Sequence, residues 1–578
     1  MEKNKMLKNI LEIIKDSAII MLVFIVTTIL LSSILFFCHI SITNNNIIVS
    51  GIITAIFAFK FYKTKEKYKI IISGILAIIV FAISITICMH TYDLSWDGNT
   101  YHKLAIGMLK DGWNPVYQTA EDFIEEDVAD VGIKDDGRNS IWIEHYPKAS
   151  WIFSANVYSA INDIEGSKII NVLMMYIGFC LIIDYLYKKT NFFYSFIITF
   201  ILIINPITIV QSFNFYIDGL MGVCIYIILY ALIALSDRNN IDNKRENVLI
   251  LGSELLICIN LKFTGLIYAT IFCLMFFVLW IYRAYKEANL KKKLKEYITY
   301  YIIVAIIAIG VVGFAPYMKN IISKGNPLYP LIGKDKQDIM SYNQPKSFEE
   351  RNSIEKFLIS LFGVSENVKS NVTDKDPTLK IPFTFSEQEI NEYNRPDLRI
   401  SGFGVLFSGI MIISIICIIF YLLKLYKLRK FEMLTMVLAF IGISLLLVLI
   451  TDGSWWARYV PYIYLFPILA LILMAMDDNK KTKVIMLVLF IIMILNNGLI
   501  INTMFNQYRN KYIVISREMK TIKKLNKKNG KVKILLNGDA FSSILYNLKD
   551  KNINVELVQD SSKLKSQKYV NFFCYENQ

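Results

Sequence analysis

Residues 70–97 read IIISGILAIIVFAISITICMHTYDLSWD, and this stretch decides the fold. Its first twenty residues carry no charge, and a helix that crosses the hydrocarbon core of a bilayer needs about 20 such residues. Because an unpaired backbone N–H or C=O group is costly in lipid, the run must be helical. Two carboxylates, those of Asp93 and Asp97, follow close to the end of this helix.

The rest of the chain repeats the apolar pattern. Of the 578 residues, 55% are hydrophobic, and the mean hydropathy is +0.45. A soluble domain has too much surface to cover for that composition. Residues 19–37 and 484–504 are further runs almost without charge. We interpret the first as a retained span and not a signal peptide, because it is long and no small-residue cleavage pattern follows it.

We therefore predict an all-α polytopic membrane protein with about 13 transmembrane helices. The predicted spans lie near residues 17–38, 46–60, 70–90, 168–187, 192–210, 217–236, 247–261, 264–282, 298–316, 402–424, 431–451, 458–476 and 484–504. The apolar stretch 247–282 is too long for one helix. The pair Lys262 and Gly265 marks the predicted break.

Basic residues predict how these spans are oriented. Lys and Arg gather in the amino-terminal segment and in the connections 60–69, 188–189, 238–245, 283–295, 424–430 and 480–483. These are alternate connections, and cytoplasmic loops carry an excess of Lys and Arg. A single orientation of the spans therefore places all of these connections, with the N-terminus, on the cytoplasmic side of a plasma membrane. The net charge of +14 is explained by this topology and does not indicate binding to nucleic acid.

Three polar segments are then predicted on the extracytoplasmic side. Residues 91–167 form a long first external loop with interfacial helices, because its apolar stretch 149–160 is too short to span. Residues 317–400 form the second external loop. We divide the chain into a transmembrane domain, 1–504, and a tail, 505–578.

The tail is predicted to be a small α/β appendage. Its pattern indicates a Lys-rich helix over 517–528, a strand over 532–536, a helix over 541–548, and strands near Val555 and Phe572. Seven of the eight cysteines lie within or at the ends of apolar runs, and Cys574 has no obvious partner. A disulfide framework is not expected, and no Cys and His spacing typical of a zinc site is present.

Asp93 and Asp97 are the first candidate functional residues. An aromatic belt at the membrane surface would account for the nearby Trp96 and Trp113. It does not account for two carboxylates within a turn or two of a span end, where charge is disfavoured. Further along the same loop lie Tyr101, His102 and His145. The histidines could ligate a divalent cation with the carboxylates, assist proton transfer, or be solvated loop residues.

Three more candidates lie in other connections on the same predicted side. Asp218 begins a span, where the helix dipole tolerates an anion; it is either a helix cap or a further carboxylate of the site. Lys262 either snorkels to the surface or contacts a phosphate. Arg458 is the best candidate for a phosphate clamp, because its planar guanidinium can hold two oxygens; a lipid-headgroup anchor is the alternative.

The order of these motifs resembles the glycosyltransferase-C superfamily, which includes protein mannosyltransferases and aminoarabinose transferases. The resemblance covers roughly residues 70–475. It rests on the first external loop with Asp93 and Asp97, on Asp218, on the turn Gly325-Asn326-Pro327-Leu328-Tyr329-Pro330, and on Arg458-Tyr459 with Pro461.

This resemblance implies an inverting transfer of a sugar from a polyprenyl-phosphate carrier. Asp97 or Asp93 would be the general base toward the acceptor hydroxyl. Arg458 and Lys262 would stabilise the departing phosphate. Asp218 would hold a divalent cation such as Mg²⁺ or Mn²⁺, or orient the donor, with His102, His145 and Tyr101 nearby. The acceptor would be an envelope lipid, glycan or protein.

Other functions are compatible with a polytopic membrane protein. A polysaccharide polymerase or ligase would also use lipid-linked glycans. A flippase or transporter would place polar residues at mid-membrane and often shows inverted repeats with broken helices. Here the polar residues gather at one surface and no repeat is evident, which favours the enzyme. If the chain were only an interaction protein, the Asp, His and Arg residues predicted at one membrane surface would have no role.

Overall fold

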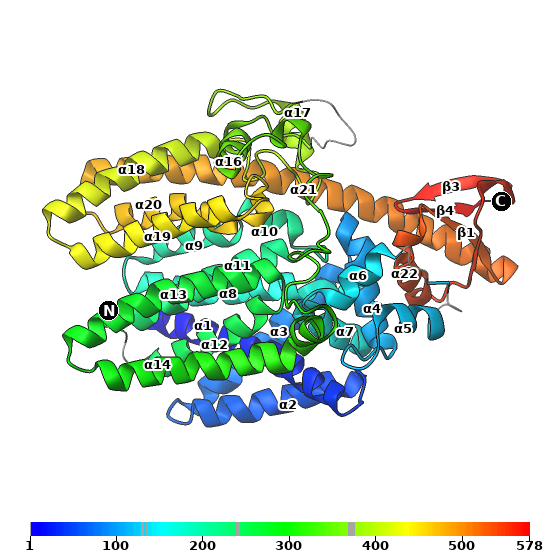
Figure 1. Ribbon diagram of the computed structural model, residues 1–578, viewed down its shortest axis with the longest axis horizontal. Helices are drawn as coiled ribbons and strands as arrows, with labels where there is room; N and C mark the ends of the chain where they lie inside the picture. Colours follow the sequence, from blue (N-terminus) through cyan, green and yellow to red (C-terminus); the bar gives the residue numbers. More distant parts are fainter. Residues whose placement is uncertain are drawn as a thin grey trace.

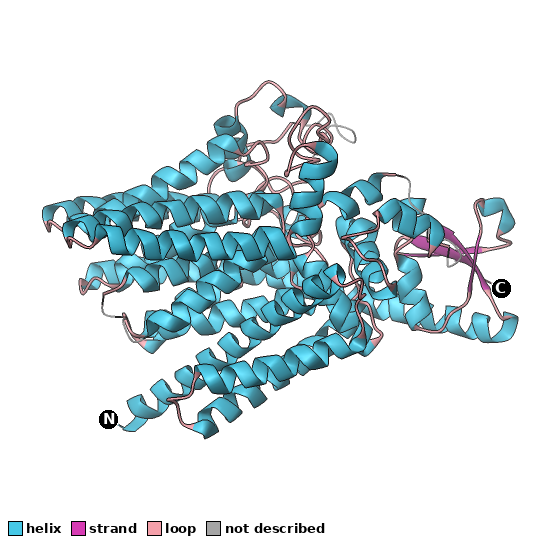
Figure 2. Ribbon diagram, turned by 60° about the horizontal axis from the view of Figure 1, so that its bottom comes forward, coloured by secondary structure: helices cyan, strands magenta, loops and turns pink. Residues whose placement is uncertain are grey.

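A bundle of long helices forms the body of the molecule, and polar segments pack at one end of it. The computed structural model describes residues 2–128, 132–133, 137–238, 240, 243–367 and 376–577, without the side chains of residues 2–4 and 138. Within these residues, strands occur only in the carboxy-terminal tail, beyond that end of the bundle (Figures 1 and 2).

The bundle contains fourteen described α-helices, two of which carry short extensions. They are α1 (Glu2–Phe37), α2 (Asn44–Phe61), α3 (Lys67–Met89), α8 (Ile170–Tyr187), α9 (Phe192–Ile203), α10 (Pro206–Gln211), α11 (Asp218–Ser236), α12 (Lys244–Ile259), α13 (Phe263–Lys286), α14 (Leu290–Ala305) with η5 (Ile306–Val312), α18 (Phe407–Lys427), α19 (Phe431–Ile450), α20 (Leu465–Ala475) preceded by η9 (Pro461–Tyr464), and α21 (Lys480–Asn529).

Each of the 13 predicted spans coincides with a helical segment. Ten helices in the described part of the chain are long and apolar enough to cross a membrane. The other three predicted spans, 192–210, 247–261 and 458–476, fall on α9 with α10, on α12, and on η9 with α20, which are shorter. The structure is therefore the helical bundle expected of a polytopic α-helical membrane protein, while the number of helices that cross the membrane stays a prediction.

The basic connections predicted to share one side of the membrane do lie at one end of the bundle. Ion pairs join them to one another across the helices. Examples are Lys65 with Asp16 at 2.8 Å, Lys15 with Glu246 at 2.7 Å, Lys189 with Asp237 at 2.5 Å, Arg283 with Glu432, and Lys424 with Asp477 at 2.8 Å. That this end is cytoplasmic remains a prediction.

The break predicted at Lys262 is present. Helix α12 ends at Ile259 and α13 begins at Phe263. A Cβ atom on Gly265 would lie 2.3 Å from the carbonyl oxygen of Cys258, so only glycine lets the two helices approach this closely. The turn places Lys262 at the same end of the bundle as the polar segments.

The first polar segment folds into short helices against the end of the bundle. They are η1 (Gly98–His102), α4 (Lys103–Asp111), α5 (Ala120–Glu126), α6 (Arg138–His145), α7 (Ala149–Ile161) and η3 (Glu165–Ile169). The predicted interfacial stretch 149–160 is α7, and its residues from Ala149 to Tyr158 are buried on every side. Helices α1, α2 and α4 pack around it, so protein and not a lipid surface covers its apolar residues.

The second polar segment is mostly irregular. It contains η6 (Phe314–Met318), α15 (Lys319–Lys324), η7 (Lys346–Phe348), α16 (Ser353–Phe362) and α17 (Glu387–Glu392), and it packs across the end of the bundle in Figure 1. A short turn, η8 (Ala457–Tyr459), follows α19 at the same end.

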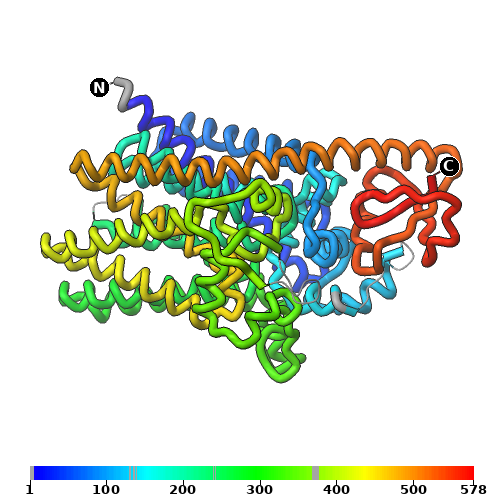
Figure 3. The backbone as a smooth tube through the Cα atoms, turned by 90° about the horizontal axis from the view of Figure 1, so that it is seen from above, coloured from blue at the N-terminus to red at the C-terminus, as the bar shows by residue number. Residues whose placement is uncertain are grey.

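Helix α21 joins the bundle to the tail without interruption. Its 50 residues correspond to a length of about 75 Å, more than twice the hydrocarbon thickness of about 30 Å. The predicted last span and the predicted Lys-rich helix 517–528 are therefore parts of one helix. Figure 3 shows it running the length of the molecule to the tail.

The tail is a four-stranded sheet with one α-helix, as the α/β pattern predicts. Its elements are β1 (Val532–Leu536), η10 (Asp539–Phe541), α22 (Ile544–Asp550), β2 (Val555–Leu557), η11 (Ser561–Lys563), β3 (Gln567–Val570) and β4 (Phe573–Glu576). The strand order is β2-β1-β4-β3, with β1 and β2 parallel and the other pairs antiparallel. Strand β1 matches its predicted range.

A buried polar cluster around Glu165 fastens the tail to the first polar segment. One carboxylate oxygen accepts hydrogen bonds from Lys103 at 2.8 Å and from the Asn547 amide of α22 at 2.9 Å. The other accepts from Lys168 at 2.5 Å and from the backbone N–H of Asp93 at 3.0 Å. The tail therefore lies at the same end of the bundle as the segment 91–167.

We predict that Glu165→Ala destabilises the protein by about 3–5 kcal/mol, because it leaves Lys103 and Lys168 buried without their anion. Guanidinium-induced unfolding in detergent measures the loss. Lys549→Ala removes an exposed ion pair with Asp111 at 3.3 Å and should cost less than about 1 kcal/mol. Equal effects of the two substitutions would contradict the assigned role of Glu165.

Candidate active site

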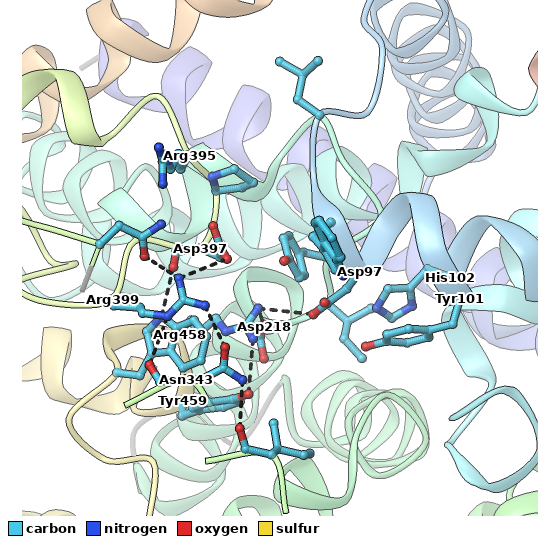
Figure 4. A pocket seen from close by; sticks show the side chains of 18 of the residues that line it. Asp97, Tyr101, His102, Asp218, Asn343, Arg395, Asp397, Arg399, Arg458 and Tyr459 are labelled. Atoms are coloured by element: carbon cyan, nitrogen blue, oxygen red, sulfur yellow. Dashed lines mark hydrogen bonds and ion pairs between the residues drawn. The ribbon is translucent and has the colours of Figure 1, made fainter. Parts of the chain in front are cut away.

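A polar cavity of about 470 Å³ opens at the end of the bundle where the polar segments meet. Five separate parts of the chain, with α21 and the tail, contribute to its wall. The charged and aromatic residues that line it include Trp96, Asp97, Tyr101, His102, Trp142, Tyr146, Tyr216, Asp218, Lys262, Arg395, Asp397, Arg399, Trp456, Arg458, Tyr459 and Phe572. Six of the eight residues predicted from sequence line this one cavity, and Figure 4 shows five of them with labels.

Asp93 is not one of the six. It is 1% exposed, and its two carboxylate oxygens accept hydrogen bonds from the backbone N–H groups of Ser95 at 2.7 Å and Phe215 at 3.1 Å. A Cβ atom on Gly98 would collide with the Asp93 carboxylate at 1.9 Å. Asp93 thus ties the loop after α3 to the start of α11 and positions Asp97; it does not face the cavity.

Asp97 faces the cavity directly. Its side chain is 27% exposed, and one carboxylate oxygen lies 3.5 Å from Nη1 of Arg458. Burial raises the pKa of Asp97, and the carboxylates of Asp397 and Asp218 act in the same direction, whereas Arg458 opposes them. A carboxylate with a raised pKa is a better proton acceptor than an ordinary one.

Asp218 and Lys262 form a buried ion pair at the cavity wall. Asp218 is the first residue of α11, and Nζ of Lys262 donates to its carboxylate at 2.7 Å. The ammonium also lies 4.2 Å from the ring centre of Tyr459, a cation–π contact. Burial disfavours the charge of Lys262, but the Asp218 carboxylate more than offsets it and raises the pKa of Lys262. Lys262 is therefore a buried cation and does not snorkel.

Arg458 lies at the centre of the charged groups. Its Nη1 atom is 3.5 Å from both Asp97 and Asp218, and its Nη2 atom donates to the Tyr459 hydroxyl at 3.3 Å. The Nε–H group is buried and makes no hydrogen bond within the described residues. Buried N–H groups of arginine are normally paired, so this guanidinium keeps one hydrogen-bond donor that the described residues leave unused.

A second guanidinium lies beside the first. The guanidinium carbon of Arg458 lies 4.1 Å from the centre of the Trp456 ring, and that of Arg399 lies 4.9 Å from the same centre. Arg399 donates to the side-chain oxygen of Asn343 at 2.7 Å and to its backbone carbonyl at 3.1 Å. Two like charges around one indole ring create a local positive potential, which favours an anionic ligand.

Tyr101 and His102 lie on the other side of Asp97 from these arginines (Figure 4). His102 accepts a hydrogen bond at Nδ1 from the Trp151 indole N–H at 2.7 Å. Because an indole nitrogen can only donate, Nδ1 is unprotonated and the proton of the neutral ring is on Nε2. Burial lowers the pKa of His102 to about 3, so this ring is neutral at physiological pH.

His145 lies outside the cavity wall. One ring nitrogen is 2.6 Å from Oδ1 of Asn320, and the ring meets Tyr329 edge-on with 4.6 Å between the ring centres. Asn320 also donates to the backbone carbonyl of Tyr329 at 2.9 Å. His145 and the turn 325–330 therefore support each other structurally.

The aromatic-belt interpretation does not fit the two tryptophans that prompted it. Trp113 is fully buried. Trp96 lines the cavity and packs edge-on against Phe541 of the tail, with 4.9 Å between the ring centres. Within the described residues, no group of three or more His, Cys, Asp or Glu side chains is arranged to hold a metal ion; Arg458 lies between Asp97 and Asp218.

Sequence reasoning missed the contribution of the second polar segment. Arg395, Asp397 and Arg399 line the cavity, and they alternate with apolar residues directly before the predicted span at 402. Charges are common in exposed loops, so their density alone does not indicate a site. The useful signal was their position within a few residues of a span, which also identified Asp97.

Comparison of the chain with protein-family models, with curated proteins and with solved structures gives no match. The function of the chain is therefore inferred from the geometry and charge of the cavity.

We predict that Arg458→Gln weakens the binding of pyrophosphate to the purified protein roughly ten- to 100-fold, because it removes charge-assisted hydrogen bonds. The affinity of Arg458→Lys for pyrophosphate should lie between those of the unmodified protein and Arg458→Gln, because an ammonium keeps the charge without the planar fork. Isothermal titration calorimetry measures the affinity. Arg283→Gln, at the opposite end of the bundle, serves as the control. Unchanged affinity in Arg458→Gln would exclude an anion site at this residue.

Proposed function

We propose that the protein is an inverting glycosyltransferase of the plasma membrane that uses a polyprenyl-phosphate-linked sugar on the extracytoplasmic side. The observation that carries the proposal is the position of Asp97. This carboxylate is directed into a polar cavity at the end of an apolar bundle, next to two arginines and a lysine. A proton acceptor beside a cationic site is what sugar transfer from a phosphate requires.

In the proposed reaction, Asp97 acts on the acceptor hydroxyl and the cations act on the donor phosphate. The carboxylate accepts the proton of an acceptor hydroxyl, and that oxygen forms a bond to the anomeric carbon of the donor. The bond between the anomeric carbon and the phosphate oxygen breaks, and its electron pair leaves with the phosphate. Because the hydroxyl attacks opposite the phosphate, the configuration at the anomeric carbon inverts.

The cations act on the leaving group. Arg458 lies 3.5 Å from both Asp97 and Asp218, and Lys262 lies 2.7 Å from Asp218, so both cations are held in place before the donor binds. Preorganised cations stabilise charge that develops on the phosphate at no cost of rearrangement. Arg399, on the same indole ring as Arg458, adds a further cation for the phosphate. The acceptor is an envelope lipid, glycan or protein.

The resemblance also implies a divalent cation on Asp218, but Lys262 and Arg458 already pair with that carboxylate, so no step of the proposed reaction is assigned to a metal. Treatment of the purified protein with EDTA tests this. Loss of transfer that Mg²⁺ or Mn²⁺ restores would assign a metal to the site, and retained transfer would leave the phosphate charge to Arg458 and Lys262.

Asp97→Asn should lower the rate of sugar transfer about 100- to 10,000-fold, because the amide cannot accept the proton. Proteoliposomes with a panel of polyprenyl-phosphate sugars, and membranes as the source of acceptor, provide the assay. Asp122→Asn, an exposed carboxylate in the same loop, is the matched control and should transfer normally. Asp93→Asn should lower stability more than the rate. Full activity of Asp97→Asn would exclude Asp97 as the base.

The rate of transfer should also depend on pH through Asp97. The reaction needs the ionised carboxylate, and burial raises its pKa above the ordinary value of 3.8. As the pH falls through the raised pKa, kcat/KM should decrease tenfold per unit, and the decrease should begin above the pH of an ordinary aspartate. A pH profile between 4 and 8 measures it. A profile that is flat down to pH 4 would contradict the assignment.

A further inference from the structure

The tail forms part of the cavity wall. Phe572, in the turn between β3 and β4, lines the cavity, as does Gln507 of α21. The tail is held there by the buried Glu165 cluster and by the Ser543 hydroxyl, which donates to the backbone carbonyl of Asn99 at 2.6 Å. This last contact joins the tail to the turn that directly follows Asp97, so the tail and the candidate base are held in fixed positions relative to each other.

Three aromatic rings pack together at this part of the wall. Trp96 meets Phe541 edge-on at 4.9 Å, and Phe541 stacks on Phe572 at 4.6 Å with 13° between the planes. Trp96 and Phe572 both line the cavity. Trp96 is 59% exposed, although large aromatic residues gain much from burial. An exposed indole held rigidly beside a candidate base is available to a ligand.

Polar groups suited to hydroxyls line the same cavity. Asn394 and Gln507 line it, and neither side-chain amide makes a hydrogen bond within the described part of the chain. An amide can both donate and accept, as can a sugar hydroxyl. A pyranose ring has an apolar face of C–H bonds and an edge of hydroxyls, so it matches an aromatic surface beside free amides.

This part of the wall also adjoins the candidate base. Arg395, Arg399 and Arg458 lie to one side of Asp97 in Figure 4, whereas Trp96 is its immediate neighbour and packs toward the tail. Trp96 directly precedes Asp97 in the chain and lines the same cavity, so a ring bound on Trp96 would bring a hydroxyl close to the candidate base.

We propose that Trp96 and Phe572 form a binding site for a pyranose ring of the acceptor, which makes the acceptor a glycan or a glycosylated lipid. This inference rests on the proposed function, since it assigns the acceptor side of the same site. The tail thereby takes part in substrate recognition.

Saturation-transfer NMR on the full-length protein in nanodiscs tests the proposal. The probes are methyl glycosides of mannose, glucose, galactose and N-acetylglucosamine. Saturation should reach the ring C–H protons of at least one glycoside. Trp96→Ala and Phe572→Ala should weaken its binding roughly three- to tenfold, and Trp96→Phe should retain it. Tyr569→Ala, which removes a 67% exposed tail aromatic outside the cavity wall, is the matched control.

The outcomes separate this proposal from the proposed function. Glycoside binding that is lost in Trp96→Ala and Phe572→Ala, while both variants still bind pyrophosphate, supports the ring site and shows that they fold. Equal glycoside binding by these variants and the unmodified protein overturns it. So does a panel in which no glycoside binds while a serine-containing peptide does. Asp97→Asn should still bind the glycoside, and full transfer by Asp97→Asn would overturn only the proposed function.

Discussion

The charges around Arg458 constrain the site more than any other interaction. A guanidinium that is 6% exposed is costly unless anions compensate it, and Asp97 and Asp218 each place an oxygen 3.5 Å away. These residues come from three distant parts of the chain. The requirement that they meet fixes the loop after α3, the start of α11 and the turn η8 relative to one another. The cavity is the space that this arrangement leaves.

A second buried cluster gives the site its outer wall. The Glu165 carboxylate accepts hydrogen bonds from Lys103, Lys168 and Asn547. Gly107 of α4 leaves room for the ring of Tyr546, because a Cβ atom added at Gly107 would lie 2.1 Å from that ring. The tail is therefore packed against α4 and not merely tethered by α21. Because Asp93 donates its backbone N–H to Glu165, the same cluster holds the loop that carries Asp97. Stability of the tail and geometry of the site are coupled through it.

Most of the architecture can be predicted from hydropathy, because apolar runs and basic connections are strong signals in a membrane protein. The helix break at Lys262 and the common location of the basic connections are examples. For the site, scarcity of charge near span ends identified Asp97, Asp218, Lys262 and Arg458. It could not tell Asp97 from Asp93, four residues earlier, because the turn at Gly98 decides which carboxylate faces the cavity. Arg399 was missed because only its position within a few residues of a span distinguishes it from the solvated cations of the same long polar segment.

Cysteine labelling tests most directly whether these distant connections form one water-accessible cavity on one side of the membrane. Asp97→Cys, Asn343→Cys and Arg458→Cys, introduced singly into a variant without the native cysteines, should react with a membrane-impermeant thiol reagent from the same side of oriented vesicles. Arg429→Cys, at the other end of the bundle, should react only from the opposite side. Labelling of positions 97 and 458 from opposite sides would contradict the account, because no shared site could then exist.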